Sequence, residues 1–221
     1  APDAAYKDGM YYFVFPAGTG TKDRKNPENS TKWMGIGVAV SDSPTGPFKD
    51  AIGGPLWRDP YANDPCLFID DDGTAYLYFH GRGSDWRVVE LADDLLSVKG
   101  DFVRMDMGGH EPKMEGPWVF KRDGIYYFTM PENNRTISYY MSESPQGPWR
   151  YQGVIMKAEG DNNNHHSIVE FNGEWILFYH RWLNLESACD KEQRHVCAEY
   201  LHFNDDGTIN EIVRTDSGIG P

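Results

Sequence analysis

The stretch "RDGIYYFTMPE" at residues 122–132 decides the fold, because the chain repeats its pattern. A polar pair and a glycine lead into a run of aromatic and β-branched residues. The same order recurs in "KDGMYYFVFPA" (7–17), "DDGTAYLYFHG" (71–81) and "FNGEWILFYHR" (171–181). A tight turn with glycine at positive φ, followed by such a run, predicts a hairpin that enters a buried strand. The glycines return at intervals of roughly 50 to 65 residues, which is typical of repeat folds.

A second motif lies between these hairpins. "VAVSDSPTGPFKD" (38–50) matches "YYMSESPQGPWRY" (139–151), and "VVELADDLLSV" (88–98) holds the corresponding place in the intervening repeat. Helical periodicity persists nowhere for more than about two turns. We therefore predict an all-β fold, a β-propeller with about four blade repeats, as a single domain over residues 1–221. A β-sandwich is the alternative, but it does not explain the period.

Composition limits the partners. The formal net charge is −13, with 34 acidic and 21 basic residues, so the surface repels phosphate backbones and nucleic acid is not expected as a partner. No apolar run reaches the 18 residues that predict a membrane-spanning helix, so no membrane partner is expected either. Neutral ligands, or cations held by carboxylates, fit better. The cysteines (Cys66, Cys189 and Cys197) are odd in number, which favours reduced thiols over a disulfide framework.

Two acids precede strands in matching positions. Asp64 stands before a proline in "YANDPCLFIDDDG", and Glu115 stands before Gly-Pro in "PKMEGPWVFKRDG". Either acid alone is more often a turn former. Equivalent positions of neighbouring blades face the same axis, so we expect both carboxylates to meet in one pocket. Such a pair raises one pKa, as a general acid in glycoside hydrolysis requires. Glu115 is the better protonated candidate because Met114 and Trp118 flank it.

A third polar cluster is "GDNNNHHSIVEF" at residues 160–171. Adjacent strand residues face opposite ways, so one of His165 and His166 should point inward. A lone histidine here is more often a hydrogen-bonded structural residue, and the chain contains no zinc-site spacing. The acidic turn at 70–73 lacks the spacing of a calcium loop and indicates a hairpin turn.

Taken together, these stretches resemble glycoside hydrolase family 43, the five-bladed propeller family of α-L-arabinofuranosidases, β-xylosidases and arabinanases. The segments "NHHSIVEF" and "RHVCAEYLHFNDDGTI" are most similar to its arabinoxylan arabinofuranohydrolase and xylosidase-like branch. The resemblance covers essentially all 221 residues. It implies an inverting glycosidase acting on arabinose- or xylose-containing oligo- or polysaccharide of plant hemicellulose.

The resemblance also implies roles for particular residues. Glu115 would be the general acid, and Asp64 would orient it and hold its pKa up. His165 would correspond to the histidine that holds a calcium ion near the propeller axis, directly or through water. Arg194 would contact substrate hydroxyls, with Arg181 as the alternative.

Aromatic side chains are candidates for stacking on sugar faces. Trp118, Trp33 and Trp86 are the candidates, although a tryptophan in the position of Trp118 is as often core packing, and Trp33 and Trp86 are more often core or strand packing. The polar loop over residues 18–33 would shape the pocket rim. A secreted or periplasmic location is favoured over a cytoplasmic one.

The chain departs from the family pattern in one respect. The family's general base is an aspartate of the first blade, and no such motif is visible here. Asp3 belongs to the second-blade motif and is not assigned as the base. Three explanations stand: the chain is N-terminally incomplete, another chain or segment supplies the missing blade, or the protein is a truncated relative. The rival functions are a carbohydrate-binding propeller without turnover and a protein-interaction propeller.

Overall fold

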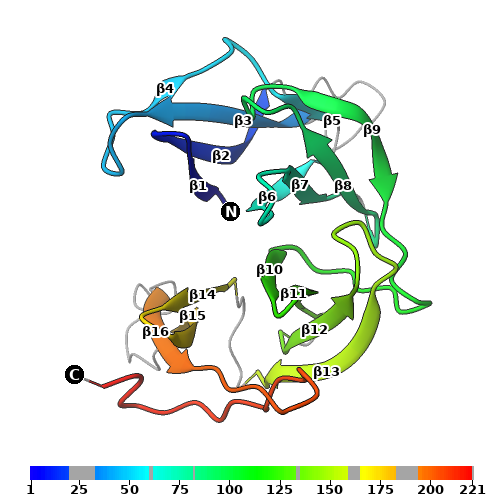
Figure 1. Cartoon of the computed structure of the whole chain (residues 1–221), viewed down its shortest axis with the longest axis vertical. Helices are drawn as coiled ribbons and strands as arrows, with labels where there is room; N and C mark the ends of the chain where they lie inside the picture. Colours follow the sequence, from blue (N-terminus) through cyan, green and yellow to red (C-terminus); the bar gives the residue numbers. More distant parts are fainter. Residues whose placement is uncertain are drawn as a thin grey trace, which may run out of the picture. The chain divides into compact units, whose positions relative to one another are not determined.

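A computed structural model of the chain describes residues 1–19, 33–59, 62–81, 83–132, 135–158, 165–182 and 194–220. Regular structure in these residues is entirely β-strand. None of them forms a helix long and apolar enough to cross a membrane. The chain divides into two compact units, Ala1–Met105 and Asp106–Pro221, each built on two antiparallel sheets (Figure 1).

The first unit contains a five-stranded and a four-stranded sheet. The five-stranded sheet has the order β1-β2-β3-β4, with β5 also paired to β3. Its strands are β1 (Asp3–Lys7), β2 (Met10–Thr19), β3 (Trp33–Ser41), β4 (Lys49–Asp50) and β5 (Trp57–Asp59). The other sheet runs β6-β7-β8-β9, with β6 (Asn63–Ile69), β7 (Ala75–His80), β8 (Trp86–Leu91) and β9 (Val98–Arg104).

The second unit contains a four-stranded and a three-stranded sheet. The four-stranded sheet has the order β10-β11-β12-β13, with β10 (Trp118–Arg122), β11 (Ile125–Pro131), β12 (Ile137–Ser142) and β13 (Arg150–Met156). The three-stranded sheet has the order β14-β15-β16, with β14 (Ser167–Phe171), β15 (Glu174–Trp182) and β16 (Arg194–Tyr200). Sequential antiparallel strands of this kind are typical of the blades of a propeller. The predicted all-β fold with four blade repeats is confirmed.

The repeated glycine motif forms the hairpin between the first two strands of each sheet, as predicted. In three sheets the turn has two residues, both with positive φ: Asp8 and Gly9 (51° and 85°), Asp123 and Gly124 (51° and 81°), Asn172 and Gly173 (55° and 83°). These are the dihedral signs of a type I′ turn, whose twist matches that of the strands. The β6–β7 connection is longer, with Gly73 at φ 86°.

Each unit has its own apolar core between its two sheets. In the first unit the central side chains include Ile36, Leu77 and Phe79, all with no exposed surface. In the second unit they include Tyr127 and Leu177, which are equally buried. The strands that follow the glycine turns supply much of both cores, with Val14 on β2, Leu77 on β7 and Tyr127 on β11 among the fully buried residues.

The first residue of the first strand ties the two sheets of each unit together. Asp3 begins β1, and its carboxylate accepts hydrogen bonds from the backbone N–H of Leu67 on β6 and of Ala4, both at 2.7 Å. Trp118 begins β10, and its indole N–H donates to the carbonyl of Ile168 on β14 at 2.8 Å. Both residues stand five positions before the residue that opens the two-residue turn. The same register position therefore performs the same task in both units.

The carboxyl group of Asp3 links folding to pH. Burial raises its pKa from 3.8 to about 6, against the lowering effect of the hydrogen bonds from Leu67, Ala4 and Cys66. Between these pH values the folded chain holds a proton that the unfolded chain has released. The free energy of unfolding therefore falls as the pH rises from about 4 to about 6, by at most about 3 kcal/mol.

We predict that Asp3→Asn removes this contribution, so the urea-unfolding free energy of the variant depends less steeply on pH between 4 and 6. Asp50→Asn is the matched control. The Asp50 carboxylate also accepts two backbone hydrogen bonds, from Ile52 and Gly53, but in an exposed turn. An equal pH slope in wild type and Asp3→Asn would contradict the assignment.

Candidate active site

Glu115 stands at a corner immediately before β10. The corner needs Gly116, because its φ of 80° is one that residues with a side chain rarely adopt. Pro117 is buried and fixes the entry into the strand. The Glu115 side chain keeps 40% of its surface exposed, and Met114 and Trp118 are half-buried. The apolar neighbours expected from the sequence are present, but they do not enclose the carboxyl group.

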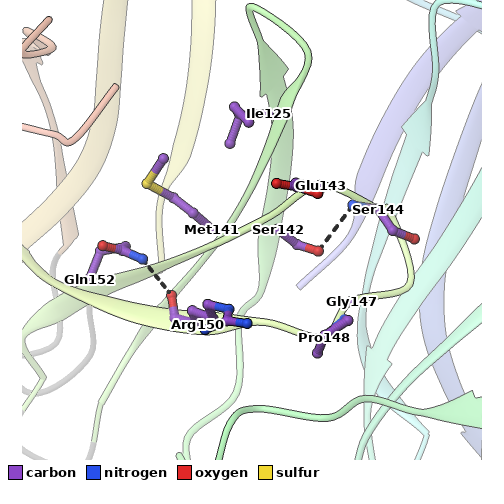
Figure 2. A pocket seen from close by; sticks show the side chains of 9 residues that line it. All are labelled: Ile125, Met141, Ser142, Glu143, Ser144, Gly147, Pro148, Arg150 and Gln152. Atoms are coloured by element: carbon purple, nitrogen blue, oxygen red, sulfur yellow. Dashed lines mark hydrogen bonds between the residues drawn. The ribbon is translucent and has the colours of Figure 1, made fainter. Parts of the chain in front are cut away.

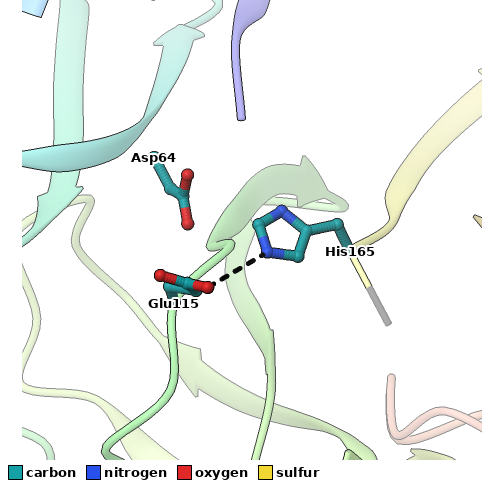
Figure 3. Close-up of side chains that lie close together, drawn as sticks. All are labelled: Asp64, Glu115 and His165. Carbon is teal, nitrogen blue, oxygen red and sulfur yellow. Dashed lines mark ion pairs between the residues drawn. The ribbon is translucent and has the colours of Figure 1, made fainter. Parts of the chain in front are cut away.

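His165 lies beside this carboxyl group. Its Nε2 is 4.0 Å from Oε1 of Glu115, and the side chain is 19% exposed (Figure 3). Burial lowers the pKa of His165, and the Glu115 carboxylate offsets this only in part. The imidazole is therefore neutral at neutral pH, and its contact with Glu115 is not a pair of full charges. Neutral imidazole is the form that binds a metal ion.

Gly116 also makes room for the ring of His165. A Cβ placed on Gly116 would lie 3.0 Å from Nδ1 of His165 and 3.1 Å from two of its ring carbons. A glycine is thus required twice, once by the backbone and once by the histidine. This packing fixes where the imidazole sits relative to the corner that carries Glu115.

His166 points to a different partner. Its Nε2 lies 2.6 Å from the hydroxyl of Thr129 on β11, inside the same unit. The two histidines thus face different neighbours, although both precede β14 and so do not follow the strand period assumed from the sequence. His165 contacts the candidate acid, whereas His166 serves as a structural hydrogen-bonding residue.

Asp64 belongs to the first unit and lies on β6; its side chain is also drawn in Figure 3. It is 3% exposed, and its carboxylate accepts a hydrogen bond from the amino group of Ala1. Its φ is 46°, a left-handed value that is rare for a residue with a side chain and rarer still before a proline. The β6–β7 pairing shifts register between Asn63 and Cys66, so the ladder is irregular where Asp64 sits.

The three tryptophans predicted to stack on sugars differ in burial and in contacts. Trp86 has no exposed surface, so its assignment as a platform is wrong: it is one of the buried hydrophobic residues. Trp118 packs against the core of the second unit while its indole N–H bonds Ile168, and its role as a platform stays a prediction. The side chain of Trp33 lies outside the described residues.

The candidate arginines also differ. Arg194 begins β16 and is exposed. Arg181 donates to Asp216 at 2.8 Å, so its guanidinium already has a carboxylate partner. Arg194 therefore remains the better candidate for contacting a substrate.

The described residues contain a pocket of about 610 Å³ at the β12–β13 turn (Figure 2). It is lined by Ile125, Met141, Ser142, Glu143, Ser144, Gly147, Pro148, Arg150 and Gln152. Ile125 directly follows the turn at the end of β10, so the pocket lies at the other end of this sheet from Glu115. Within the sheet, the pocket and the candidate acid are separate features.

The turn that forms this pocket, between β12 and β13, has a counterpart in the first unit. At Ser142 the hydroxyl accepts from the N–H of Ser144 at 3.1 Å, and at Ser41 the hydroxyl accepts from the N–H of Ser43 at the same distance. The first unit also repeats the acid, Gly-Pro and basic residue, as "SDSPTGPFK" against "SESPQGPWR". We therefore assign no function to it.

Sequence reasoning missed the part played by Asp3. It recognised the residue only as a member of a motif, because an isolated aspartate says nothing about a partner 64 positions away. A usable signal was present: Asp3 holds the same place before its glycine turn as Trp118 does.

Comparison with known proteins identifies the class of molecule. The family description "Glycosyl hydrolases family 43" matches residues 1–209. The β-D-galactofuranosidase xynD of Aspergillus niger is 33% identical, over 95% of this chain and 61% of its own length. The xylosidase/arabinosidase 43A of Humicola insolens is also 33% identical, over 95% of this chain and 73% of its own length.

A solved structure agrees with both. The crystal structure of CoXyl43, a β-xylosidase/α-arabinofuranosidase from a compost microbial metagenome, is that of a calcium-free form in complex with xylotriose. It aligns with a TM-score of 0.77 at 34% identity, covering 96% of this chain and 72% of that one. The region that contains the blade repeats thus matches known glycosidases along nearly its whole length. The chain is a member of glycosyl hydrolase family 43.

We predict that Gly116→Ala moves the ring of His165, whereas Gly124→Ala does not. Both glycines have nearly the same φ, 80° and 81°, so both variants lose about 1–2 kcal/mol of stability from backbone strain. Only at Gly116 does the new methyl group meet a neighbour, since nothing lies within 4 Å at Gly124.

Imidazole ¹⁵N and ¹H chemical shifts of His165 provide the measurement. Unchanged His165 signals in Gly116→Ala would refute the packing argument, as would equal shifts in both variants.

Proposed function

We propose that this protein is an inverting glycosidase that removes or cleaves α-L-arabinofuranosyl or β-D-xylosyl residues of plant hemicellulose. Family membership supports the reaction class, and the names of the relatives support the pentose substrates. The observation that carries the proposal is Glu115, held at a glycine corner before β10 with a neutral imidazole beside it. The proposed fold of the whole enzyme is a five-bladed propeller.

The proposed chemistry starts with the leaving group. Glu115 delivers a proton to the glycosidic oxygen as the bond to the anomeric carbon breaks, so the departing sugar leaves as an alcohol. The family resemblance gives Asp64 the task of orienting Glu115 and keeping it protonated. Arg194 is proposed to bind sugar hydroxyls, with Trp118 and Trp33 as stacking candidates. An inverting enzyme also needs a base to activate water on the opposite face, and we assign no residue of the 221 to that role.

Replacement of Glu115 tests its proposed role as the general acid. We predict that Glu115→Gln lowers kcat on xylotriose by about 10²–10⁴-fold, because protonation of a poor leaving group is lost. The loss on 4-nitrophenyl xyloside or arabinofuranoside is smaller, since nitrophenolate departs with little help. Glu111→Gln, an exposed acid of the same segment, is the matched control and retains the wild-type rate.

Equal losses on both kinds of substrate, or an unchanged rate, would show that Glu115 is not the general acid. Binding of xylotriose without hydrolysis by the wild-type protein would instead favour a carbohydrate-binding propeller. That alternative is kept because no base is assigned.

We also propose a calcium ion at His165. The donor set fits only a water-rich site, because Ca²⁺ takes six to eight oxygen ligands and the described residues of the second unit place one carboxylate, that of Glu115, beside the His165 imidazole. When bound, the ion would supply a fixed positive charge in the site. The protein itself supplies the His165 imidazole, which is neutral and packed against Gly116.

We predict that Ca²⁺ raises the Tm of the wild-type protein, because a ligand that binds only the folded state stabilises it. The rise is lost in His165→Ala and kept in His202→Ala, an exposed histidine of the same unit. Differential scanning calorimetry with Ca²⁺ and with Mg²⁺ measures this. A rise that survives in His165→Ala would exclude His165 as a ligand.

A further inference from the structure

The backbone around Asp64 cannot hold its shape through strand pairing alone. Asp64 has a left-handed φ of 46°, and the β6–β7 ladder is interrupted between Asn63 and Cys66. A residue with a side chain in this conformation costs about 1–3 kcal/mol and persists only where its surroundings enforce it. Something outside the ladder must therefore fix the segment that presents Asp64.

Two groups of the first unit do so: the amino group of Ala1 bonds the Asp64 carboxylate itself, and Asp3 holds the backbone that follows it. The Oδ2 of Asp3 accepts the N–H of Leu67 at 2.7 Å, three residues beyond Asp64, and the thiol of Cys66 is a further hydrogen-bond partner. Its Oδ1 accepts the N–H of Ala4 at 2.7 Å, which anchors the same carboxylate to β1. Asp3, Cys66 and Leu67 are 9%, 1% and 6% exposed, so water does not compete for these bonds.

The hydrogen bond between Leu67 and Asp3 lies at the edge of β6 that has no strand partner among the described residues. Among the strands of the described residues, β6 pairs with β7 alone, so its other edge carries backbone groups that need partners. Asp3 satisfies one of these groups at Leu67, directly after the irregular stretch. An N–H left unsatisfied at such a buried place costs about 1–3 kcal/mol. A carboxylate with two acceptor oxygens suits the task, because both of its main-chain partners, on β1 and on β6, are donors.

We propose that Asp3 is a positioning residue: by clamping Cys66 and Leu67 to β1, it holds the Asp64 carboxylate in the orientation that catalysis uses. This rests on the proposed function of Asp64. The role is distinct from that of a base, because Asp3 does not act on substrate. It acts through the backbone of β6. The equivalent residue of the second unit, Trp118, holds β14 just beyond His165 in the same way.

A double-mutant cycle tests the proposal. The variants are Asp3→Asn, Asp64→Asn, their combination and the Asp50→Asn control. Asn keeps the size of the side chain but presents an NH₂ group to one of the two N–H donors. We expect Asp3→Asn to lower kcat on xylotriose by at least about tenfold with little change in KM, because misplacement of a catalytic group costs rate more than binding. Asp50→Asn leaves kcat unchanged.

The cycle separates positioning from general destabilisation. If Asp3 acts only through Asp64, Asp3→Asn has less than about a threefold effect on kcat in the Asp64→Asn background, while the two losses in Tm still add. The proposal is overturned if the fold-losses in kcat of the two single variants multiply in the double variant. It is also overturned if Asp3→Asn has the same kcat as the Asp50→Asn control. Full activity of Asp64→Asn alone refutes the role of Asp64 in the proposed function instead.

A second measurement does not need turnover. Cys66 is 1% exposed beneath the clamp, so its alkylation by iodoacetamide reports opening of the segment. We expect faster labelling of Cys66 in Asp3→Asn than in wild type or Asp50→Asn, at temperatures where all three are folded. Peptide mass spectrometry distinguishes Cys66 from Cys197. Equal labelling rates in the three proteins overturn the proposal whether or not the chain hydrolyses sugar.

Discussion

A propeller blade leaves one edge of its first strand without a strand partner, and the buried polar groups of that edge must be satisfied in some other way. In this protein one side chain does so in each unit. Asp3 accepts from Leu67, and Trp118 donates to Ile168. Both stand at the same register position, although one is an acceptor and the other a donor. The hydrogen bond between sheets is therefore required by the architecture, whereas the residue type that makes it is free to vary.

These clamps matter because the segments they hold carry the candidate site. Leu67 follows Asp64 by three residues, and Ile168 follows His165 by three. Neither functional side chain emerges from regular strand backbone: Asp64 has a left-handed φ, and His165 precedes the start of β14. Rigid strands supply the framework, and strained or irregular backbone at their ends aims the side chains. The pattern explains why a buried carboxylate with a costly desolvation is retained at Asp3.

Much of the fold follows from local sequence. The Asp-Gly and Asn-Gly turns, the aromatic strands after them and the Ser-Pro turns are short-range features, and the structure confirms them. The matching positions of Asp64 and Glu115 follow from the same repeats, and their meeting in one pocket stays a prediction. Contacts between distant segments were beyond such reasoning. The bond from Leu67 to Asp3 joins residues 64 apart, and the partner of His166 is a threonine 37 residues away.

The roles of the aromatic residues could not be predicted from local sequence either. Trp86 and Trp118 carry no sequence signal that separates a sugar platform from core packing, and only burial distinguished Trp86. The exposed edge of Glu115 likewise could not be inferred from its apolar neighbours, since a corner can turn a side chain away from them. Function at such a site is decided by where a sugar would lie relative to the carboxyl group.

A crystal structure of the protein with a bound xylo-oligosaccharide would locate that sugar directly. We expect a glycosidic oxygen within about 2.6–3.2 Å of the Glu115 carboxyl group, which is hydrogen-bonding distance for proton transfer. A sugar bound in an ordered way elsewhere, for example in the pocket beside Ser142 and Arg150 with Glu115 facing solvent, would contradict the assignment of Glu115 as the acid.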